Sequence, residues 1–545
     1  MSLPFSLFDS YQKQAITITP QSTVLEGTVK IYTCGPTVYN YQHIGNMRAV
    51  WLADSMVNTL KMMGYDTEWV LNITDVGHLV GDGDDAKNIS TSEDKISKSA
   101  KSQNKTVQDI VQFYTNDYLV QTKALNFNLP DNMDQFQPDV RSGVVNPLAS
   151  EYVEQQMVLA LELLADNRAY ILNDGIYFDS QANVDLQVPF SIIETNEGDT
   201  QFTGRDLVNT TKNPSDFALW KFVDENSLQK WKFYDYPLAI NALAQCFSVE
   251  GRIMHKWGCP GWHSECVAMI CSILGRKLLK KRESFSFADF RSKTIIDIHT
   301  GGEDHIDIHH KNEILQSEAL GFHLSKYWVH NKFVLVDNKK MSKSVGNVFL
   351  VKGSQESTGF ESIESRGYDP LSYRLMLHEH NYNTQLDFTW DKLTQSQTRL
   401  YNLRKEASKL KSFSVQCKDN FVEGFHLTNN TTELEWLAIV GDNLNLGRLL
   451  EVYTQLLNSV VNLVQSENIL FQNDYNLLQR FDSELLKLNL FYSSVPKEVY
   501  NLARSRQKAK DNKDYQLSDQ LRQEILAIGY QVDDYKWGWG LWIYR

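Results

Sequence analysis

The sequence has little of what marks secreted and membrane proteins. Six cysteines in 545 residues are too few for a disulfide framework. No run of about 18 apolar residues occurs, so no membrane span is expected. The opening segment MSLPFSLFDSYQKQ lacks a basic region followed by an apolar core, which argues against a signal peptide. We therefore expect a cytoplasmic protein with reduced thiols and no membrane partner.

Positive charge is also in short supply. The formal net charge is −13, which excludes a general affinity for nucleic acid, so any RNA partner needs local basic faces. Hydrophobic residues make up 42% of the chain and charged residues 22%, proportions typical of packed domains. A chain of this length predicts roughly three or four of them.

The first 77 residues predict a strand, a helix and a second strand. The segment TVKIYTCG (28–35) reads as a strand that stops at a Gly-Pro turn. Residues 45–63 read as a helix ending at Gly64, and residues 67–77 as a second buried strand. Such a unit implies a parallel sheet, whose ligands bind at the carboxyl ends of the strands, where residues 34–46 fall.

The predicted secondary structure changes several times along the rest of the chain. Residues 126–245 break into short strands and turns, as an inserted subdomain would. Residues 294–320 read as strand, glycine turn and helix, which restores the first pattern. A strand and a basic loop follow over 332–347, and beyond about residue 396 the pattern is mainly that of amphipathic helices.

The segment HIGN (43–46) combines a glycine with polar side chains at a predicted helix start. Gly45 lets a flat ring approach the backbone, and the first turn of a helix offers free N–H groups to phosphate. His43 and Asn46 can donate to phosphate oxygens. Taken alone, these four residues favour the plainer interpretation, a helix start with an incidental histidine.

The segment KKMSKS (339–344) is more specific. Lys340 and Lys343 lie three apart in a short loop with two hydroxyls. Such a loop can close over a polyphosphate and balance the charge that develops as pyrophosphate leaves. A solvated basic turn is the plain alternative, and the presence of HIGN early and KMSKS late, each beside a predicted strand, argues against it.

Several metal-type ligands lie in two segments, GWHSECVAM (261–269) and HIDIHHKNE (305–313). His309 and Glu313 are four apart and share a helix face. With Cys34 and Cys266 they form a set of two thiolates, one imidazole and one carboxylate that suits Zn²⁺. His305 and His309 are also four apart, His310 is adjacent to His309, and no CxxC pattern is present, so periodicity leaves the choice of ligands open.

Taken together, these motifs resemble the cysteinyl-tRNA synthetases, a family of class I aminoacyl-tRNA synthetases. The resemblance runs from about residue 5 to about residue 470. It is carried, in the family's order, by YTCGPTVYNYQHIGNMR, NITDVGH, SEDKI, DFALWK, PGWHSECVAM, GGEDHIDIHHKNEI, KMSKSVGN and NTQLDFTW.

The resemblance implies roles for particular residues. The implied zinc ligands, which do not include His310, are Cys34, Cys266, His309 and Glu313. The implied residues that handle ATP in catalysis are His43, Asn46, Lys340 and Lys343. The implied residues that line the ATP and cysteine sites are Gly35, Thr37, Gly45, Thr74, Trp262, Gly302 and Asp304, with Thr74 and Trp262 in the cysteine pocket and Asp304 on the nucleotide.

The resemblance also implies an α/β fold with a Rossmann-like parallel-sheet catalytic domain, an inserted subdomain and a mainly α-helical C-terminal region. The implied segments are the two catalytic halves (1–125 and 246–330), a connective insert (126–245), a stem-contact region with the KMSKS loop (331–395), a helical tRNA-binding bundle (396–490) and a small anticodon-recognition domain (491–545).

The implied reaction has two steps in a monomer. Cysteine attacks the α-phosphate of ATP, which enters with Mg²⁺, to give cysteinyl-adenylate and pyrophosphate. The 3′ end of tRNA(Cys) then accepts the cysteinyl group. One Zn²⁺ per chain would select the substrate thiol, since the hydroxyl of serine competes poorly for such a site.

The sequence departs from the family in places, and two alternatives stay open. Long segments at 222–255 and 275–293 lie near the expected site, and PDVRSGVV (138–145) and the C-terminus follow the family only loosely. A ligase that gives activated cysteine to a small amine would share the core, although the long helical tail favours tRNA. A non-catalytic descendant is the other alternative, and the intact signatures argue against it.

The tail holds one cluster of basic residues. Residues 500–513 contain Arg504, Arg506, Lys508, Lys510 and Lys513 and precede a predicted amphipathic helix at 514–528. One face there could dock an anticodon stem, or it could be an ordinary solvated helix face.

Overall fold

The structure is a computed structural model of the whole chain. It describes residues 3–18, 28–77, 95–133, 144–183, 211–246, 250–278, 285–342, 345–353, 359–416, 420–423, 427, 433–491, 495–535 and 537–543. Lys343 and Cys417 lie outside the described residues, as do most of PDVRSGVV and part of SEDKI.

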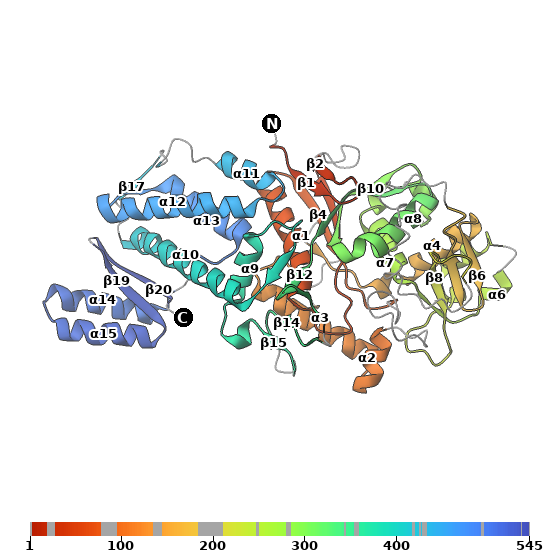
Figure 1. Cartoon of the computed structure of the whole chain (residues 1–545), viewed down its shortest axis with the longest axis horizontal. Coiled ribbons are helices and arrows are strands. Elements are labelled where there is room, and N and C mark those ends of the chain that lie inside the picture. The colour runs from red at the N-terminus through yellow and green to blue at the C-terminus, as the bar shows by residue number, and fades with distance from the viewer. Residues whose placement is uncertain are drawn as a thin grey trace.

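A five-stranded parallel sheet occupies the middle of the molecule (Figure 1). Its strands, in spatial order, are β11 (His323–Asn331), β10 (Thr294–Gly302), β3 (Thr28–Thr33), β4 (Asp66–Leu71) and β5 (Val144–Val145). The chain leaves β3 toward β4 on one side and leaves β10 toward β11 on the other. Such a reversal opens a crevice at the carboxyl ends of the two central strands. The predicted parallel sheet is confirmed.

The helix that follows β3 is α1 (Ile44–Met62). It begins at the N-cap His43 and ends before Gly64, whose φ of +87° is readily adopted only by glycine. The predicted helix is therefore confirmed to within a residue. The second strand is shorter than predicted, because the side chain of Asn72 bonds the Gly35 N–H and the Thr74 hydroxyl and turns the chain.

Two small elements flank this unit. The hairpin of β1 (Ser6–Asp9) and β2 (Gln14–Thr17) precedes it, with β1 packed against β11. The pair of helices α2 (Lys95–Gln103) and α3 (Val107–Ala124) follows β4, and α3 leads toward β5.

The inserted part forms a separate antiparallel sheet on the right of Figure 1. Its strands in order are β6 (Ala169–Leu172), β7 (Gly175–Phe178), β8 (Phe217–Phe222) and β9 (Gly258–Pro260). The helices around it are α4 (Val153–Ala165), α5 (Pro237–Leu243), α6 (Glu250–Ile253) and α7 (Trp262–Ile273). Because α7 follows β9 directly, the chain leaves the antiparallel sheet at Trp262 and continues through α7 toward β10 of the parallel sheet.

After β10 the chain makes a 3₁₀ turn (Glu303–His305) and a π-helical turn (Ile306–His310), then enters α8 (Lys311–Ala319). Beyond β11 come a three-stranded sheet and a helix that lead to the C-terminal part. These elements are β12 (Val334–Val336), β13 (Lys339–Lys340), β16 (Leu386–Phe388) and α9 (Pro370–His378), with β14 (Phe349–Leu350) and β15 (Glu361–Ser362) beside them.

The rest of the chain is mainly helical, as predicted, and lies on the left of Figure 1. Its elements are α10 (Trp390–Gln416), β17 (Phe421–Val422), α11 (Glu433–Gly441), α12 (Leu446–Glu467), β18 (Leu470–Phe471) and α13 (Gln472–Phe481). α10 runs without interruption across residue 396. The six-segment division of the chain stays a prediction.

The last unit has a core of its own. It consists of α14 (Lys497–Asp511), α15 (Tyr515–Ala527), β19 (Tyr530–Tyr535) and β20 (Gly538–Ile543). The buried hydrophobic cluster of this core comprises Val499, Ala503, Ile525, Val532, Trp539 and Leu541. Within the described ranges of the whole chain, no helix combines the length and the apolarity needed to cross a bilayer.

Candidate active site and metal centre

The first candidate residues follow the tip of β3. The backbone N–H of Cys34 donates to the carbonyl of Thr300 on β10, at 3.1 Å, so the cysteine sits where the two central strands end. Gly35 donates its N–H to Asn72 Oδ1 at 2.9 Å. A Cβ at Gly35 would lie 1.6 Å from the carbonyl oxygen of Asn72, so only glycine fits at this close approach.

The structure brings the four predicted metal ligands together in one buried cluster. The Sγ atoms of Cys34 and Cys266 are 3.7 Å apart, and Cys266 Sγ lies 3.5 Å from His309 Nε2. His309 Nε2 lies 2.8 Å from Glu313 Oε1. The donor atoms of all four lie within 4.8 Å of one another. Cys34 comes from the end of β3, Cys266 from α7, His309 from the π-helical turn and Glu313 from α8.

These distances can be compared with those around a tetrahedral zinc ion. Zn–S bonds of about 2.3 Å and Zn–N bonds of about 2.0–2.1 Å place two sulfurs about 3.8 Å apart and a sulfur and a nitrogen about 3.6 Å apart. The two measured separations that involve sulfur, 3.7 Å and 3.5 Å, agree with this geometry. The shorter contact between His309 and Glu313 is a hydrogen bond. The residues present therefore fit a zinc ion.

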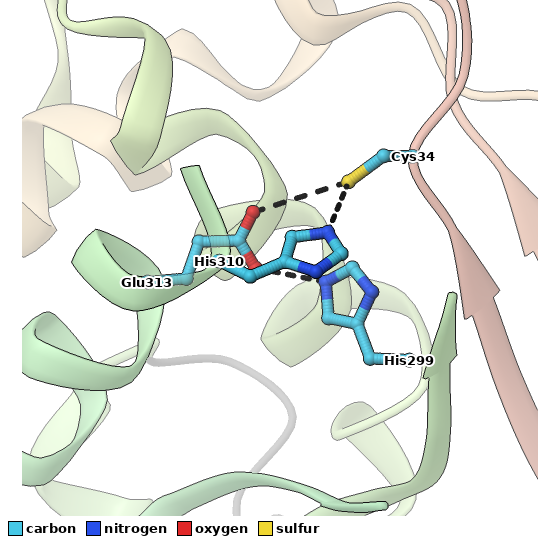
Figure 2. A group of neighbouring side chains, drawn as sticks. All are labelled: Cys34, His299, His310 and Glu313. Carbon is cyan, nitrogen blue, oxygen red and sulfur yellow. Dashed lines mark hydrogen bonds and ion pairs between the residues drawn. The ribbon is translucent and has the colours of Figure 1, made fainter. Parts of the chain in front are cut away.

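A second possible set overlaps the first and contains two ligands that the prediction left out (Figure 2). His310 Nε2 lies 3.3 Å from Cys34 Sγ, and His299 Nε2 lies 2.8 Å from Glu313 Oε2. The second nitrogen of His310, Nδ1, is 2.7 Å from His330 Nε2. Two thiolates suit zinc better than one, which favours the set with Cys266.

His299 was not singled out from the sequence. It lies inside β10, where alternation places it on one face with Asp297 and with Gly301 near the strand's end. That alternation is the one signal that could have identified it. A buried histidine within a strand more often simply belongs to the core, so the signal is weak.

The cluster is electrostatically polarised. Burial alone would raise the pKa of Cys266, but the hydrogen bond from Cys34 and the nearby His309 bring it down to about 6. Burial would lower the pKa of His309, but Glu313 and Cys266 raise it to about 10. His299 and His309 hold the pKa of Glu313 far below its usual range despite burial. A cationic imidazole thus sits between a thiolate and a carboxylate, and a divalent cation would complement the same anions.

The predicted cysteine-pocket residues border this cluster. The ring of Trp262 stacks on that of His309, with centroids 4.3 Å apart and planes at 20°. Thr74 is buried, donates its N–H to Pro36 O at 3.0 Å and accepts from Val38 N–H at 3.1 Å. Thr37 pairs with Thr74 in this short parallel bridge. The loop after β4 is thereby fastened to the segment between Cys34 and the HIGN motif.

The HIGN residues cap their own helix. His43 Nδ1 accepts from Gly45 N–H at 3.1 Å, and Asn46 Oδ1 accepts from His43 N–H at 2.9 Å. Because Nδ1 acts as an acceptor, the neutral ring carries its proton on Nε2. The capping explains why a histidine starts this helix, and it sets the orientation of the imidazole.

The two signature segments lie against each other. A Cβ at Gly45 would be 2.5 Å from Met341 Cε of the KMSKS loop. Asn347 fastens the base of that loop, since its Oδ1 accepts from Ser342 N–H at 2.8 Å and its Nδ2 donates to Lys340 O at 3.2 Å. The Lys340 ammonium lies over the ring of Phe333, 4.8 Å from its centroid. Asn347 was quoted in the motif, but no role was predicted for it.

The glycine turn after β10 lies at the same edge of the sheet. Gly302 ends the strand, and Asp304 is exposed in the following 3₁₀ turn. Glu303, which the prediction missed, accepts from Phe333 N–H at 2.5 Å and pairs with Lys332 at 2.8 Å. This carboxylate holds the turn against residues 332–333, which lead into the KMSKS loop. The glycine turn and the KMSKS loop, both predicted to contact ATP, are thereby connected through the side chain of Glu303.

Comparison with known proteins agrees with this arrangement. The family model for the class I (C) tRNA synthetase catalytic domain matches residues 20–239 and 249–398. The chain is 31% identical to a cysteine–tRNA ligase of Novosphingobium aromaticivorans over 99% of this chain and 98% of that protein. It is 30% identical to a cysteine–tRNA ligase of Treponema denticola over 93% of this chain and 94% of that protein.

Among solved structures, a Mycobacterium tuberculosis methionyl-tRNA synthetase in complex with methionyl-adenylate is 12% identical. It covers 86% of this chain and 92% of its own, with a TM-score of 0.48, a likeness too distant to carry an argument. The family model and the nearly full-length relatives decide the matter: the chain belongs to the cysteine–tRNA ligase family of class I tRNA synthetases.

Proposed function

We propose that the protein is an ATP-dependent cysteine–tRNA ligase. It activates cysteine to cysteinyl-adenylate with release of pyrophosphate and transfers the cysteinyl group to the 3′ end of tRNA(Cys). The observation that carries the proposal is the position of a buried two-thiol cluster at the same sheet edge as the HIGN and KMSKS segments, which touch through Gly45 and Met341.

The metal centre supports selection of the amino acid. Cys34, Cys266, His309 and Glu313 would hold a zinc ion, which when bound supplies a Lewis acid for the thiol of cysteine and discriminates against the hydroxyl of serine. Trp262 stacks on His309 and would form the wall of the pocket on that side. Thr74, fastened to residues 36–38, would form the opposite wall.

The nucleotide is handled by a helix start and a loop. The positive end of the α1 dipole would favour the phosphates of ATP, which enters with Mg²⁺, and the Nε2–H of His43 would donate to their oxygens. Lys340 and Lys343 would balance the negative charge that grows on pyrophosphate as it leaves. Positioning and charge stabilisation are sufficient for this chemistry, so no protein nucleophile is needed.

The remote C-terminal unit supports tRNA as the acceptor. Arg504 and Lys508 are exposed and one helical turn apart on α14, whereas Arg506 and Lys510 are paired with Asp534. The basic face is therefore narrower than the sequence suggested. We place the enzyme in the cytoplasm, since the five cysteines among the described residues are free, which suits a reducing compartment.

Exchange of labelled pyrophosphate into ATP tests the first step, and charging of tRNA(Cys) tests the second. We expect exchange with cysteine at least 10⁴-fold more efficient than with serine, a ratio typical of sites built around one specific bond. Absence of cysteine-dependent exchange would refute the proposal. Exchange without tRNA charging, together with transfer of cysteine to a small amine, would favour the small-amine ligase.

A further inference from the structure

An amide from the long segment after β8 contacts the loop that carries Thr74. Gln229 Nε2 donates to the main-chain carbonyl of Asp75 at 2.7 Å. The contact lies inside the fold, since Gln229 is 9% exposed and Asp75 is 5% exposed. Asp75 directly follows Thr74, so this hydrogen bond holds the peptide unit between Asp75 and Val76, one residue beyond the predicted pocket residue.

The loop of Thr74 and Asp75 is also hydrogen-bonded to residues 36–38 and to Ser150. Thr74 is fastened to residues 36–38, and the Asp75 carboxylate accepts from both the N–H and the hydroxyl of Ser150, at 2.8 Å and 2.6 Å. Beyond them, Gly77 turns with φ of +79° against the side chain of Glu265, one residue before Cys266. The segment after β8 adds a further hydrogen bond to this loop, from Gln229 to the Asp75 carbonyl.

The same segment also holds the start of α7. Trp231 and Gly258 exchange both backbone hydrogen bonds, at 2.8 Å and 2.9 Å, and the strand from Gly258 leads into Trp262. One stretch of chain therefore connects the loop of Thr74 with the helix that carries Trp262. The family model leaves a gap in this stretch, since its matches end at residue 239 and resume at residue 249.

Only one of the two polar atoms of the Gln229 amide is hydrogen-bonded to the described part of the protein. Among the described residues, its Oε1 has no hydrogen-bond partner although it is buried. A buried carbonyl without a partner is destabilising, which offsets part of the stability that the hydrogen bond from Nε2 to Asp75 contributes. Buried polar groups that contribute little net stability to a protein core are typical of functional sites.

We propose that Gln229 is a positioning residue for cysteine binding. It holds the Asp75 carbonyl and thereby fixes Thr74 at its distance from Trp262. The inference rests on the proposed function, in which these two residues line the cysteine pocket. The hydrogen bond of Gln229 goes to the main chain of Asp75, which is neither a predicted metal ligand nor part of the HIGN or KMSKS segment.

The test is Gln229→Leu in the full chain, assayed by cysteine-dependent pyrophosphate exchange. We expect the KM for cysteine to rise about five- to tenfold, the factor that one lost hydrogen bond produces. The KM for ATP and kcat should stay within twofold, and the variant should remain folded at the assay temperature. Gln245→Leu, at an exposed glutamine of the same segment, is the matched control and should leave all these values unchanged.

Gln229→Glu provides a second variant of the same shape. Its carboxylate places an acceptor against the Asp75 carbonyl, so the KM for cysteine should rise at least as much. An unchanged KM for cysteine in either folded variant overturns the inference, as does an equal loss for cysteine and ATP or a failure of both variants to fold. If the unmodified protein shows no cysteine-dependent exchange, the proposed function fails instead.

Discussion

Arg374 on α9 and Asp54 on α1 form an ion pair that solvent does not reach, with Nη2 and Oδ2 2.9 Å apart and both side chains 0% exposed. Arg374 also donates to the carbonyls of Leu125, at 2.7 Å, and Leu486, at 2.8 Å. Lys487 lies 3.4 Å from the other oxygen of Asp54. One guanidinium thus connects the helix of the HIGN motif with α3 and with the helical C-terminal part.

Replacing Arg374 with methionine should be strongly destabilising. The change leaves Asp54 buried with Lys487 as its remaining cation, and breaking a buried pair typically costs about 3–5 kcal/mol. Urea unfolding followed by tryptophan fluorescence measures it. Arg448→Met, in a pair with Glu451 whose side chains are both 56% exposed, is the control and should change stability by about 0.5 kcal/mol or less. Equal effects of the two changes would contradict the assignment.

Metal content should distinguish the two possible ligand sets. We expect the purified protein to contain one zinc per chain and Cys266→Ser to lose most of it, because a thiolate is a far better zinc ligand than a hydroxyl. His310→Asn should retain the metal. Cys271→Ala, in the same helix and also buried, is the matched control. Zinc lost with His310→Asn and kept with Cys266→Ser would assign the metal to the set shown in Figure 2.

Lys340→Ala should lower kcat for pyrophosphate exchange by more than it raises the KM for ATP. The loop is proposed to bind the charge that grows during the reaction, and a loss confined to the transition state appears in kcat. A 10²-fold fall is the order of magnitude expected for one such donor. Lys352→Ala, at a surface pair with Glu364, should have no effect. A change in KM alone would mean that Lys340 only binds ATP in the ground state.

Removing residues 495–545 should separate the two steps. This unit has its own core, and it contacts the rest mainly through α10, where Gln416 Nε2 donates to Trp539 O at 2.6 Å. Exchange should persist while charging of tRNA(Cys) falls at least tenfold. In the full chain, alanine at both Arg504 and Lys508 should weaken charging and reduce its salt dependence. A truncated protein that charges tRNA normally would exclude this unit as a docking element.

Asp482 should make stability fall as pH rises from about 4 to 6. Burial raises its pKa from 3.8 to about 6, although the N–H groups of Leu490, Phe491 and Leu488 oppose the shift. Between these values the folded state binds more protons than the unfolded state, so the protonated form contributes stability that is lost with rising pH. The loss is on the order of 3 kcal/mol, at about 1.4 kcal/mol per pKa unit.

Comparison of unfolding midpoints in urea between pH 4 and 6 for the unmodified protein and Asp482→Asn isolates this contribution, because other titrations cancel. Asp442→Asn, at an exposed position, is the control. If the difference between the two proteins grows in the opposite direction, the three backbone N–H groups outweigh burial and the pKa of Asp482 is lowered.

Local patterns in the sequence were sufficient for the elements that build the site. The strand before Gly35, the helix ending at Gly64 and the strand–turn–helix around Gly302 were all predicted within a few residues. Their pairing order was not, because it depends on contacts such as Ile31 with Ile298 that no local pattern encodes. The four residues predicted as metal ligands lie close together, and their role as ligands stays a prediction. Spacing alone had also left His305 and His310 as candidates.

The C-terminal helix shows where periodicity misleads. Leu517, Leu521, Ile525 and Ile528 share a helical spacing that predicts one buried stripe. Only Leu521 and Ile525 are buried, whereas Leu517 is 42% and Ile528 is 51% exposed. In the part of the chain that the structure describes, α15 packs mainly against α14 and β19, so the ends of its apolar face extend beyond the core. Gln229 was missed for another reason, since its partner Asp75 lies 154 positions away.

The side-by-side placement of β3 and β10 has a consequence for the biogenesis of the protein. Thr33 and Thr300, which bond across these strands, are separated by 267 positions, and Cys34 and Cys266 by 232. At a synthesis rate of about 5–20 residues per second, β10 is synthesised on the order of 10–50 s after β3. Throughout that interval one edge of a buried strand is unpaired and Cys34 has no second thiol beside it. The nascent chain is therefore most exposed to aggregation in this window, and the sheet edge that carries the site forms only near the end of translation of the first 330 residues.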